Sequence, residues 1–388
     1  MPNPTSMTTS GLFKRKRPPN LTLTLNASTV PSPMNAQKLS PSTQACTTPE
    51  VKVFIKELIG DIDAHITYHN KHSIKHGENG FVKLCTLLFP SKNKFCTLIK
   101  KQGGSSVAHE IKMVNSIKNT ISSNFPFHLC SLPIFHRSSL ATHFFYTCYR
   151  KLGDLEINSN TLHEKLQSED RSVFHTIFRI VHQLVTILDA LHNSKFRDEK
   201  GKIHEGIIHN DIKPNNILLK ENGDVELADF GCAYYKDEPA SQFSTYYFIA
   251  PEIWTNPEFC KNKIKNIDKA DIWSLGATLM YLLKNRRPIG PSEKSDNEFE
   301  KILIYKKWAE NYNTYWESLN LDLQRQAFTS LKQPLEKLAL LMLAPVELRP
   351  EAKELKIALD NSIRFLEIDG KPKNLCANKR FMHSFAQI

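Results

Sequence analysis

A short stretch of the sequence holds most of the side chains that could do chemistry. Ile207 to Leu219 carries one histidine, one aspartate, one lysine and three asparagines between isoleucines and leucines. A carboxylate can accept a proton, a lysine can offset negative charge, and carboxylate and amide oxygens are ligands that Mg²⁺ accepts. The alternative interpretation is a polar turn between two strands, with its hydrogen bonds satisfied internally.

His209, Asp211, Lys213 and Asn216 have the spacing of the catalytic loop of eukaryotic-type protein kinases, and Asp229-Phe230-Gly231 follows at the expected distance. The chain therefore resembles this family. The resemblance implies phosphoryl transfer, which depends on positioning and charge neutralisation more than on covalent chemistry. It also implies that Asp211 accepts the proton of a substrate hydroxyl, that Lys213 offsets charge on the γ-phosphate, and that Asn216 and Asp229 hold Mg²⁺.

Three further motifs follow in the order in which kinases present them: Ala250-Pro251-Glu252, Asp271 to Gly276, and Leu348-Arg349-Pro350. In the family, the glutamate of the first motif pairs with the arginine of the last, and the aspartate of the second braces the catalytic loop. The resemblance gives these roles to Glu252, Arg349 and Asp271. Small-molecule kinases of the aminoglycoside or choline type are a poorer match, because they generally lack this series.

Upstream, Thr97-Leu98-Ile99-Lys100 resembles the strand whose lysine contacts the α- and β-phosphates of ATP, and Glu110 resembles the helical partner of that lysine. Lys101 is a competing choice, but strand alternation puts Lys100 on the face of Leu98, where the family usually has an alanine against the adenine. The resemblance thus implies an ATP site formed by Lys100, Glu110, Gly77, Asn79, Gly80, Leu84, Leu98 and Leu218.

The phosphate-binding loop departs from the family. Gly77 aligns with the first glycine of the motif, but Asn79 and Val82 replace the second and third. A glycine backbone can approach phosphate closely, whereas β-branched valine cannot adopt the same conformations freely. This departure supports an alternative function, a pseudokinase that acts as a scaffold for nucleotides or partners. Against it, the sequence retains all five of the motif residues Lys100, Glu110, Asp211, Asn216 and Asp229.

A second departure is Asn210, where many kinases carry an arginine that pairs with a phosphate on the activation segment. Its absence predicts activity that does not depend on phosphorylation of Ser241 or Ser244. Lys213, two residues after Asp211, and Thr245 resemble serine/threonine kinases rather than tyrosine kinases. The predicted activity is transfer of the ATP γ-phosphate to serine and threonine hydroxyls of a protein substrate.

These residues need elements that hold them together. Phe81 to Phe89 and Lys94 to Lys100 have the composition of two strands joined by a turn at 90–93, Ser106 to Ile117 that of a short helix, and Thr142 to Tyr149 that of a strand. Val51 to Ile66 has helical spacing. After Gly153, a long amphipathic helix carries Phe174 to Leu191, with Ser168 as its expected N-cap, and Ile272 to Leu283 is apolar on nearly all faces.

The expected fold is α+β and bilobal, as in protein kinases, with a small strand-rich N-lobe and a larger helical C-lobe. The kinase domain is expected over residues 50–366, with the N-lobe at 50–150 and the C-lobe at 155–366; 1–49 and 367–388 are predicted tails. The stretch 195–205 and part of 291–333 are expected to be insertions that form solvated loops, and the alternative is that either one recruits a partner.

Residues 1–49 contain no Asp or Glu, five basic residues, fifteen Ser or Thr and eight Pro, a composition typical of disorder. Part of the net charge of +11 therefore belongs to this tail. Its basic cluster, Lys14 to Arg17, resembles a signal for a nuclear import receptor, and a solvated charge run is the alternative. No basic motif with interleaved aromatic residues supports nucleic-acid binding.

The eight cysteines lack zinc or disulfide-framework spacing, and no apolar run is long enough to span a bilayer. We therefore expect an intracellular protein, which is cytoplasmic and, if the basic cluster at Lys14 to Arg17 acts as a targeting signal, also nuclear. The acid-free tail would also suit a kinase that a pathogen delivers into a host cell.

Overall fold

The computed structural model describes residues 65–77, 80–89, 94–133, 135–138, 143–148, 153–169, 171–220, 222–239, 245–255, 266–285, 290–291, 294–325 and 332–367. The predictions for the tail at 1–49, its basic cluster, most of the helix at 51–66, the turn at 90–93 and residues 368–388 lie outside these ranges. Asn79, Ser241 and Ser244 also lie outside them.

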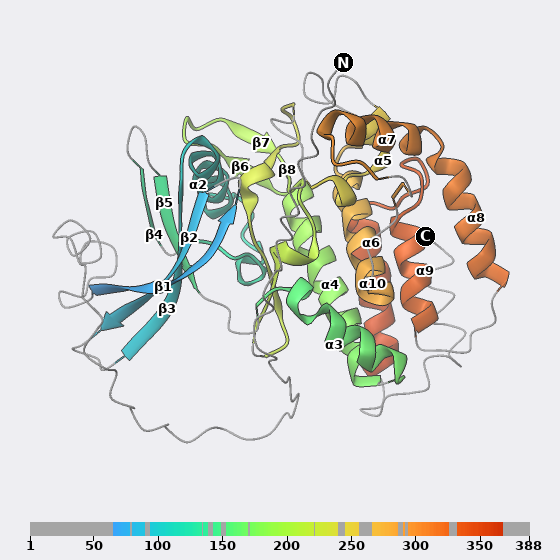
Figure 1. Ribbon diagram of the computed structural model, residues 1–388, viewed down its shortest axis with the longest axis horizontal. Helices are drawn as coiled ribbons and strands as arrows, with labels where there is room; N and C mark the ends of the chain where they lie inside the picture. Colours follow the sequence, from blue (N-terminus) through green and yellow to red (C-terminus); the bar gives the residue numbers. More distant parts are fainter. Residues whose placement is uncertain are drawn as a thin grey trace, which may run out of the picture. The chain divides into compact units, whose positions relative to one another are not determined.

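The N-terminal part of the described chain is one antiparallel sheet with α2 beside it (Figure 1). Both strands predicted around the turn and the strand predicted at 142–149 are confirmed, in the order β1-β2-β3-β5-β4. The strands are β1 His65–Gly77, β2 Gly80–Phe89, β3 Lys94–Gly103, β4 Phe135–Ser138 and β5 His143–Cys148.

Helix α2, Ser105–Lys118, confirms the helix predicted at 106–117. It packs on the sheet through Val107 and Ile111, which form a buried cluster with Phe145 of β5. The phenylalanine lies opposite Lys101 of β3 in the sheet register. Since directly opposed residues of an antiparallel pair share one face, Lys101 lies on the face that α2 covers.

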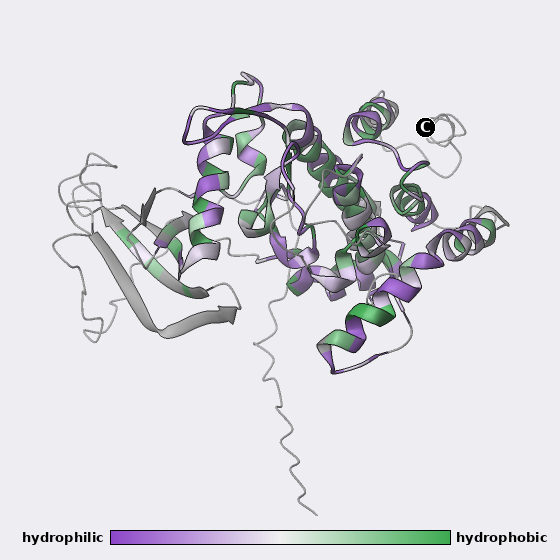
Figure 2. Cartoon of the chain, turned by 90° about the horizontal axis from the view of Figure 1, so that it is seen from above, coloured by the Kyte–Doolittle hydropathy of each residue, from purple (hydrophilic) through white to green (hydrophobic). Residues whose placement is uncertain are grey.

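The C-terminal part is helical, and hydrophobic and hydrophilic residues alternate along its helices (Figure 2). The predicted amphipathic helix and the all-round apolar helix are both present, as α4 and α6. The helices are α3 Leu155–Gln167, α4 Arg171–Asn193, α5 Pro251–Thr255, α6 Lys269–Lys284, α7 Glu298–Glu310, α8 Tyr312–Arg325, α9 Lys332–Met342 and α10 Ala352–Glu367.

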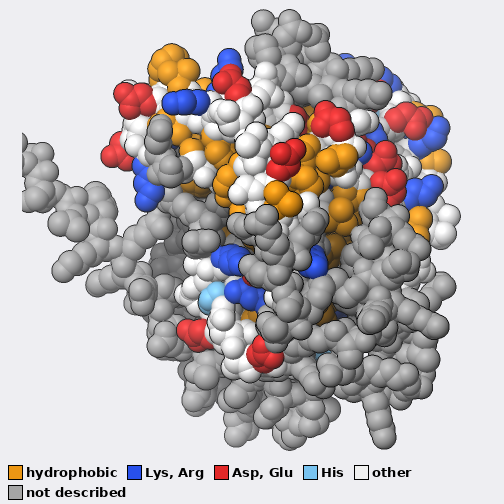
Figure 3. Space-filling model, turned by 90° about the vertical axis from the view of Figure 1, so that its right-hand side faces the viewer, with side chains coloured by type: hydrophobic (Ala, Val, Ile, Leu, Met, Phe, Trp, Pro, Cys, Tyr) orange, Lys and Arg blue, Asp and Glu red, His pale blue; other side chains and the backbone are white. Residues whose placement is uncertain are grey.

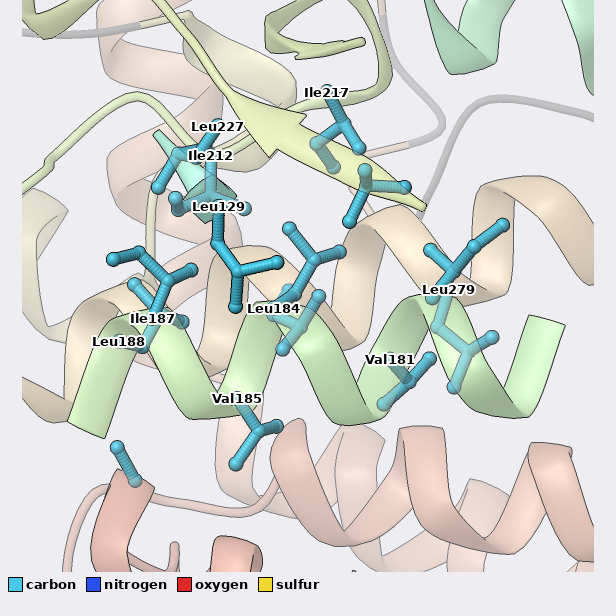
Figure 4. Close-up of a cluster of buried hydrophobic side chains, with 14 of the residues drawn as sticks. Leu129, Val181, Leu184, Val185, Ile187, Leu188, Ile212, Ile217, Leu227 and Leu279 are labelled. Atoms are coloured by element: carbon cyan, nitrogen blue, oxygen red, sulfur yellow. The ribbon is translucent and has the colours of Figure 1, made fainter. Parts of the chain in front are cut away.

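The main core surrounds α4 (Figure 4). Leu184 and Leu188 of this helix share a buried cluster with Ile212 and Leu227, which come from the segments that carry the polar loop. Val185 lies on another side of α4, and α10 packs against the same helix. The apolar face of α4 thus packs against the segments that carry the polar loop.

The prediction that Ser168 caps the start of α4 is wrong. Ser168 is the C-terminal cap of the preceding helix α3, and its hydroxyl donates to the Lys165 carbonyl oxygen at 2.8 Å. Helix α3 begins at Leu155, where the side chain of Asp154 accepts a hydrogen bond from the Ile157 N–H. Serine occurs at both ends of helices, because its hydroxyl can accept from N–H groups at the start and donate to carbonyl oxygens at the end. The sequence alone therefore did not show which of the two ends Ser168 marks.

Among the described residues, Ser172–Asn193 is the one stretch whose length and apolar composition would suit a membrane span. This stretch is most of α4, whose apolar side chains are packed inside the core. Core helices of soluble proteins have the same composition, so the finding is weak evidence for a span.

Short strands hold the polar loop in place. β8 Ile207–Ile208 precedes the loop and pairs with β11 Tyr234–Tyr235, whereas β9 Ile217–Leu219 follows it and pairs with β10 Val225–Leu227. The loop therefore begins and ends on paired backbone.

Both predicted insertions contain regular secondary structure within the described residues. Residues 195–205 form a hairpin of β6 Lys195–Arg197 and β7 Ile203–Glu205, in which Phe196 and His204 are completely buried, so the expectation of a solvated loop is wrong there. The second insertion contains α7 and α8.

Candidate active site

The backbone of the polar loop is held by one buried carboxylate. Asp271 at the start of α6 accepts hydrogen bonds from the backbone N–H groups of His209 and Asn210, each at 2.8 Å. His192 of α4 lies 2.9 Å from the same carboxylate. The bracing role predicted for Asp271 is confirmed, and His192 is a partner that the sequence did not indicate.

Asn210 has a left-handed backbone, with φ of +62°. Asparagine adopts this conformation at lower cost than most residues, because its short polar side chain can form local hydrogen bonds. Here its amide nitrogen donates to the Cys232 carbonyl oxygen at 3.4 Å. The residue therefore suits the turn that aims Asp211, although it carries no positive charge.

Asp211, Lys213, Asn216 and Thr245 form one hydrogen-bond cluster, which we call the catalytic network. Lys213 Nζ donates to Asp211 Oδ2 at 2.7 Å and to the Thr245 hydroxyl at 2.6 Å. The same hydroxyl donates to Asp211 Oδ1 at 3.0 Å. Asn216 Nδ2 donates to Asp211 Oδ2 at 2.9 Å. Both oxygens of the buried Asp211 carboxylate are thus fixed in direction.

The prediction that Lys100 is the partner of Glu110 is wrong, because the adjacent Lys101 makes this contact. Lys101 Nζ lies 2.7 Å from Glu110 Oε2 and 2.9 Å from Asp229 Oδ1. The continuous register of β3 with β2 places Lys100 on the opposite face. The sequence prediction correctly grouped Lys100 with Leu98, but that face is not the one covered by α2.

The same register corrects the expected adenine contact. Ile99 shares the Lys101 face and lies opposite Leu84 of β2, whereas Leu98 is buried on the other face. Val82 lies opposite Lys101 and is half-buried. The β-branched residue that replaces a glycine therefore stands on the same side of the sheet as the lysine.

The other described residues of the predicted nucleotide site, Gly77, Gly80 and Leu218, lie in paired strands. Gly77 and Gly80 are paired with each other across the β1–β2 hairpin, on either side of the undescribed Asn79. Leu218 of β9 is half-buried and lies opposite Glu226 of β10. Their contact with nucleotide remains a prediction.

Burial and charge set the protonation of the lysine cluster. Burial, with the nearby Asp229 adding to it, raises the pKa of Glu110 to about 7 against the opposing effect of Lys101. Burial works against the charge of Lys101, but Glu110 and Asp229 together outweigh it and raise the lysine pKa. Burial also opposes ionisation of Asp229, yet Lys101 overcomes it and lowers the pKa of Asp229. Lys101 and Asp229 are therefore charged at neutral pH.

Asp229 has a left-handed backbone, with φ of +64°, and its side chain accepts from the Gly231 N–H at 3.4 Å. Phe230 is completely buried, with its ring centroid 4.9 Å from that of His209. The buried phenylalanine anchors the turn that holds the carboxylate beside Lys101.

Asn216 and Asp229 fit the ligand chemistry of Mg²⁺. The Asn216 amide nitrogen donates to the Asp211 carbonyl oxygen at 2.8 Å and to Asp211 Oδ2 at 2.9 Å, which directs the Asn216 side-chain oxygen elsewhere. The Asp229 side chain is 37% exposed, although Lys101 beside it is largely buried. Within the described ranges no cluster of three His, Cys, Asp or Glu side chains could hold a metal by itself. Mg²⁺ commonly binds through one or two protein oxygens and completes its shell with phosphate and water.

The predicted pair of Glu252 and Arg349 is confirmed. Arg349 is buried and its two terminal nitrogens donate to the two Glu252 oxygens at 2.5 and 3.1 Å. It also donates to the Ala344 and Lys269 carbonyl oxygens. This contact fixes α5, which follows Thr245, to the helical core.

Comparisons with known proteins agree with this geometry. The family model for the protein kinase domain matches residues 68–356, well over half of the chain. Serine/threonine-protein kinase dst2 of Dictyostelium discoideum is 43% identical over 89 residues, 22% of this chain and 8% of that protein. Probable serine/threonine-protein kinase FMP48 of Saccharomyces cerevisiae is 39% identical over 125 residues, 27% of this chain and 34% of that protein.

A further relative has a different stated specificity. Putative tyrosine-protein kinase C03B1.5 of Caenorhabditis elegans is 30% identical over 173 residues, 43% of this chain and 44% of that protein. The chain spans less than half the length of each of these curated relatives.

Proposed function

Because the chain belongs to the protein kinase family, we propose that it uses ATP and Mg²⁺ to phosphorylate serine and threonine hydroxyls of proteins, with Asp211 as the catalytic base. The observation that carries this proposal is the catalytic network. Its lysine and threonine hold one carboxylate from two sides, so that Asp211 faces a substrate hydroxyl in one orientation. Orientation of this kind supplies much of the barrier reduction in phosphoryl transfer.

Residues in and around the catalytic network neutralise the negative charge of the ATP phosphates. Lys213 lies beside Asp211 and offsets charge on the transferred phosphate. Lys101 binds the α- and β-phosphates, and Glu110 keeps it in place. Asn216 and Asp229 hold the metal through their oxygens. When bound, Mg²⁺ neutralises the charge that develops between the β- and γ-phosphates.

Serine and threonine specificity is supported by the contact between Lys213 and Thr245. The 2.6 Å hydrogen bond brings a residue of the activation segment to the catalytic base. This contact requires the lysine two residues after Asp211, the position that the sequence linked to serine/threonine kinases. Most of the relatives named above carry the same specificity in their names.

A scaffold without catalysis is the second candidate. The register that puts Val82 opposite Lys101 favours it, because a branched side chain then occupies a position where the family has a bare backbone. The catalytic network and the Lys101–Glu110 pair count against it. Neither arrangement is needed to bind a partner protein.

The test is transfer of labelled phosphate from Mg-ATP to the protein itself and to a generic basic protein. We expect transfer by the natural chain and none by Asp211→Ala. Asp211→Ala should retain its thermal shift with Mg-ATP, which shows that it is folded and binds nucleotide. Absence of transfer in every assay, together with no thermal shift of the natural chain, would favour the scaffold.

A further inference from the structure

A group of aromatic rings joins the activation segment to the second insertion. We call Tyr246, Trp254 and Tyr305 the aromatic bridge. The rings of Tyr246 and Trp254 stack at 5.3 Å with an interplanar angle of 16°, and those of Trp254 and Tyr305 at 5.1 Å with 28°. Tyr305 also lies 5.9 Å from Tyr246. These three residues come from η5 Tyr246–Phe248, α5 and α7.

The aromatic bridge is anchored to the core of the helical part. Tyr305 contacts Trp308 one turn later, and Trp308 packs edge-on against Tyr312 at 5.2 Å. Tyr312 accepts from Trp273 of α6 at 2.9 Å and donates to the Leu343 carbonyl oxygen at 2.6 Å. Because Tyr312 and Trp273 are buried, the far end of this chain of contacts is rigid.

The near end of the bridge adjoins the catalytic network. Tyr246 directly follows Thr245, whose hydroxyl and backbone N–H both donate to Asp211 Oδ1, at 3.0 and 3.3 Å. A shift of the Tyr246 backbone would therefore move both donors. Many kinases fix this segment with a phosphate bound to an arginine, but position 210 is an uncharged asparagine here.

We propose that Tyr305 is a positioning residue, which acts through Trp254 and Tyr246 to hold Thr245 against Asp211 and Lys213. The inference rests on the proposed kinase function, and it assigns to the α7–α8 insertion a role in ordering the activation segment. Packing of three stacked rings replaces, in this chain, the charged contact that Asn210 cannot make.

α7 offers a matched control. Its exposed face carries Phe299, whose side chain is 68% exposed, and Ile302 and Leu303 are also exposed. Hydrophobic side chains gather in the upper part of the face seen from the α8 side (Figure 3). Phe299→Ala removes an aromatic ring from the same helix as Tyr305→Ala, without touching the described rings of the bridge.

The kinetic test measures kcat and KM for phosphate transfer. We expect Tyr305→Ala to lower kcat about 10-fold with an unchanged KM for ATP, since a small displacement of an orienting group costs rate rather than nucleotide binding. Tyr305→Phe should restore kcat because it restores the ring, and Phe299→Ala should match the natural chain. Equal losses in Tyr305→Ala and Phe299→Ala would overturn the proposal.

A double-mutant cycle tests the route through Thr245. In a Thr245→Ala background, we expect Tyr305→Ala to change kcat by less than about 2-fold, because residues that act through one contact are not additive. The full single-variant loss in both backgrounds would show that Tyr305 acts on something else.

Hydrogen exchange separates this inference from the proposed function. The Thr245 amide should exchange faster in Tyr305→Ala than in the natural chain and in Phe299→Ala. This measurement needs no activity, so it applies even if the natural chain transfers no phosphate. An unchanged exchange rate of the Thr245 amide in Tyr305→Ala would overturn this inference. Absence of phosphate transfer by the natural chain, with faster exchange in Tyr305→Ala, would instead overturn the proposed kinase function.

Discussion

Lys101 and Glu110 form a 2.7 Å ion pair between β3 and α2, and the same lysine lies 2.9 Å from Asp229. The Lys101 and Glu110 side chains are 14% and 6% exposed, so water screens the pair only weakly. Lys101 therefore ties the sheet, helix α2 and the turn before Phe230 to one point. Its neighbour Lys100 is on the other face of β3.

The two neighbouring lysines allow a direct comparison. We expect Lys101→Met to lower phosphate transfer about 100-fold or more, because it removes a preorganised charge from the reacting phosphates. Lys100→Met should retain transfer within about 3-fold, because the side chain is on the opposite face of the sheet. Labelled-phosphate transfer at saturating ATP measures both. A larger loss in Lys100→Met than in Lys101→Met would contradict the assigned register.

Glu110 predicts a pH dependence of stability. Its pKa in the folded chain is raised to about 7 from an ordinary value of 4.5. The folded state thus binds this proton more tightly than the unfolded state. The resulting stability is present below about pH 4.5 and is lost as the pH rises through 7, by about 1 to 3 kcal/mol.

Glu110→Gln isolates this contribution, because glutamine does not ionise. Urea unfolding of both chains between pH 5 and pH 8 should show that the natural chain loses stability relative to Glu110→Gln as the pH rises. A constant difference over this range would show that Glu110 is charged throughout it.

The pair of Glu252 and Arg349 predicts a large stability loss. Arg349→Leu should lower the free energy of unfolding by about 3 to 5 kcal/mol, because it leaves the Glu252 carboxylate and two carbonyl oxygens without their donor. Arg349→Lys should recover only part of this, since one ammonium cannot make the two-pronged contact. Urea denaturation measures both. A loss below about 1 kcal/mol in Arg349→Leu would contradict the structural role of the pair.

The β6–β7 hairpin depends on His204. The buried imidazole lies 2.9 Å from Asp237 through Nδ1 and 3.5 Å from Asp198 through Nε2, and it stacks on Tyr235 at 3.6 Å. We expect His204→Ala to lower the free energy of unfolding by about 2 to 4 kcal/mol, because it opens a cavity and removes the imidazole partner of Asp237 Oδ1. Arg197→Ala, on the exposed side of the same hairpin, is the control and should leave the melting temperature nearly unchanged. A stability loss in His204→Ala as small as that in Arg197→Ala would show that the buried imidazole contributes little to the fold.

Asn210 predicts independence from phosphorylation of the activation segment. Ser241→Ala and Ser244→Ala should each retain kcat within about 2-fold, because position 210 offers no cation for a phosphate. Kinetics of dephosphorylated protein provide the comparison. A 10-fold loss in either variant would show that a phosphate is bound by some other group.

Several features could be predicted from single residues and their order. The strands on either side of 90–93, α2, α4 and α6 follow from their hydrophobic patterns, because each element buries one face or all faces. Asp271 and the Glu252–Arg349 pair followed from the order of motifs. Helix α3 was not predicted as a separate element. The burial of His204 was not predicted either, because a charged stretch such as 195–205 is usually solvated.

The sequence by itself determined which residues are the candidates for the chemistry: Asp211, Lys213, Asn216 and Asp229 match the spacing of the protein kinase motifs along the chain. Only the tertiary structure decided between Lys100 and Lys101. Strand alternation assigns two neighbours to opposite faces but does not say which face α2 covers. The aromatic bridge likewise needed the fold, because its rings come from segments about 50 residues apart and meet only when α7 packs beside α5. Contacts of this kind depend on how elements pack, which no local pattern records.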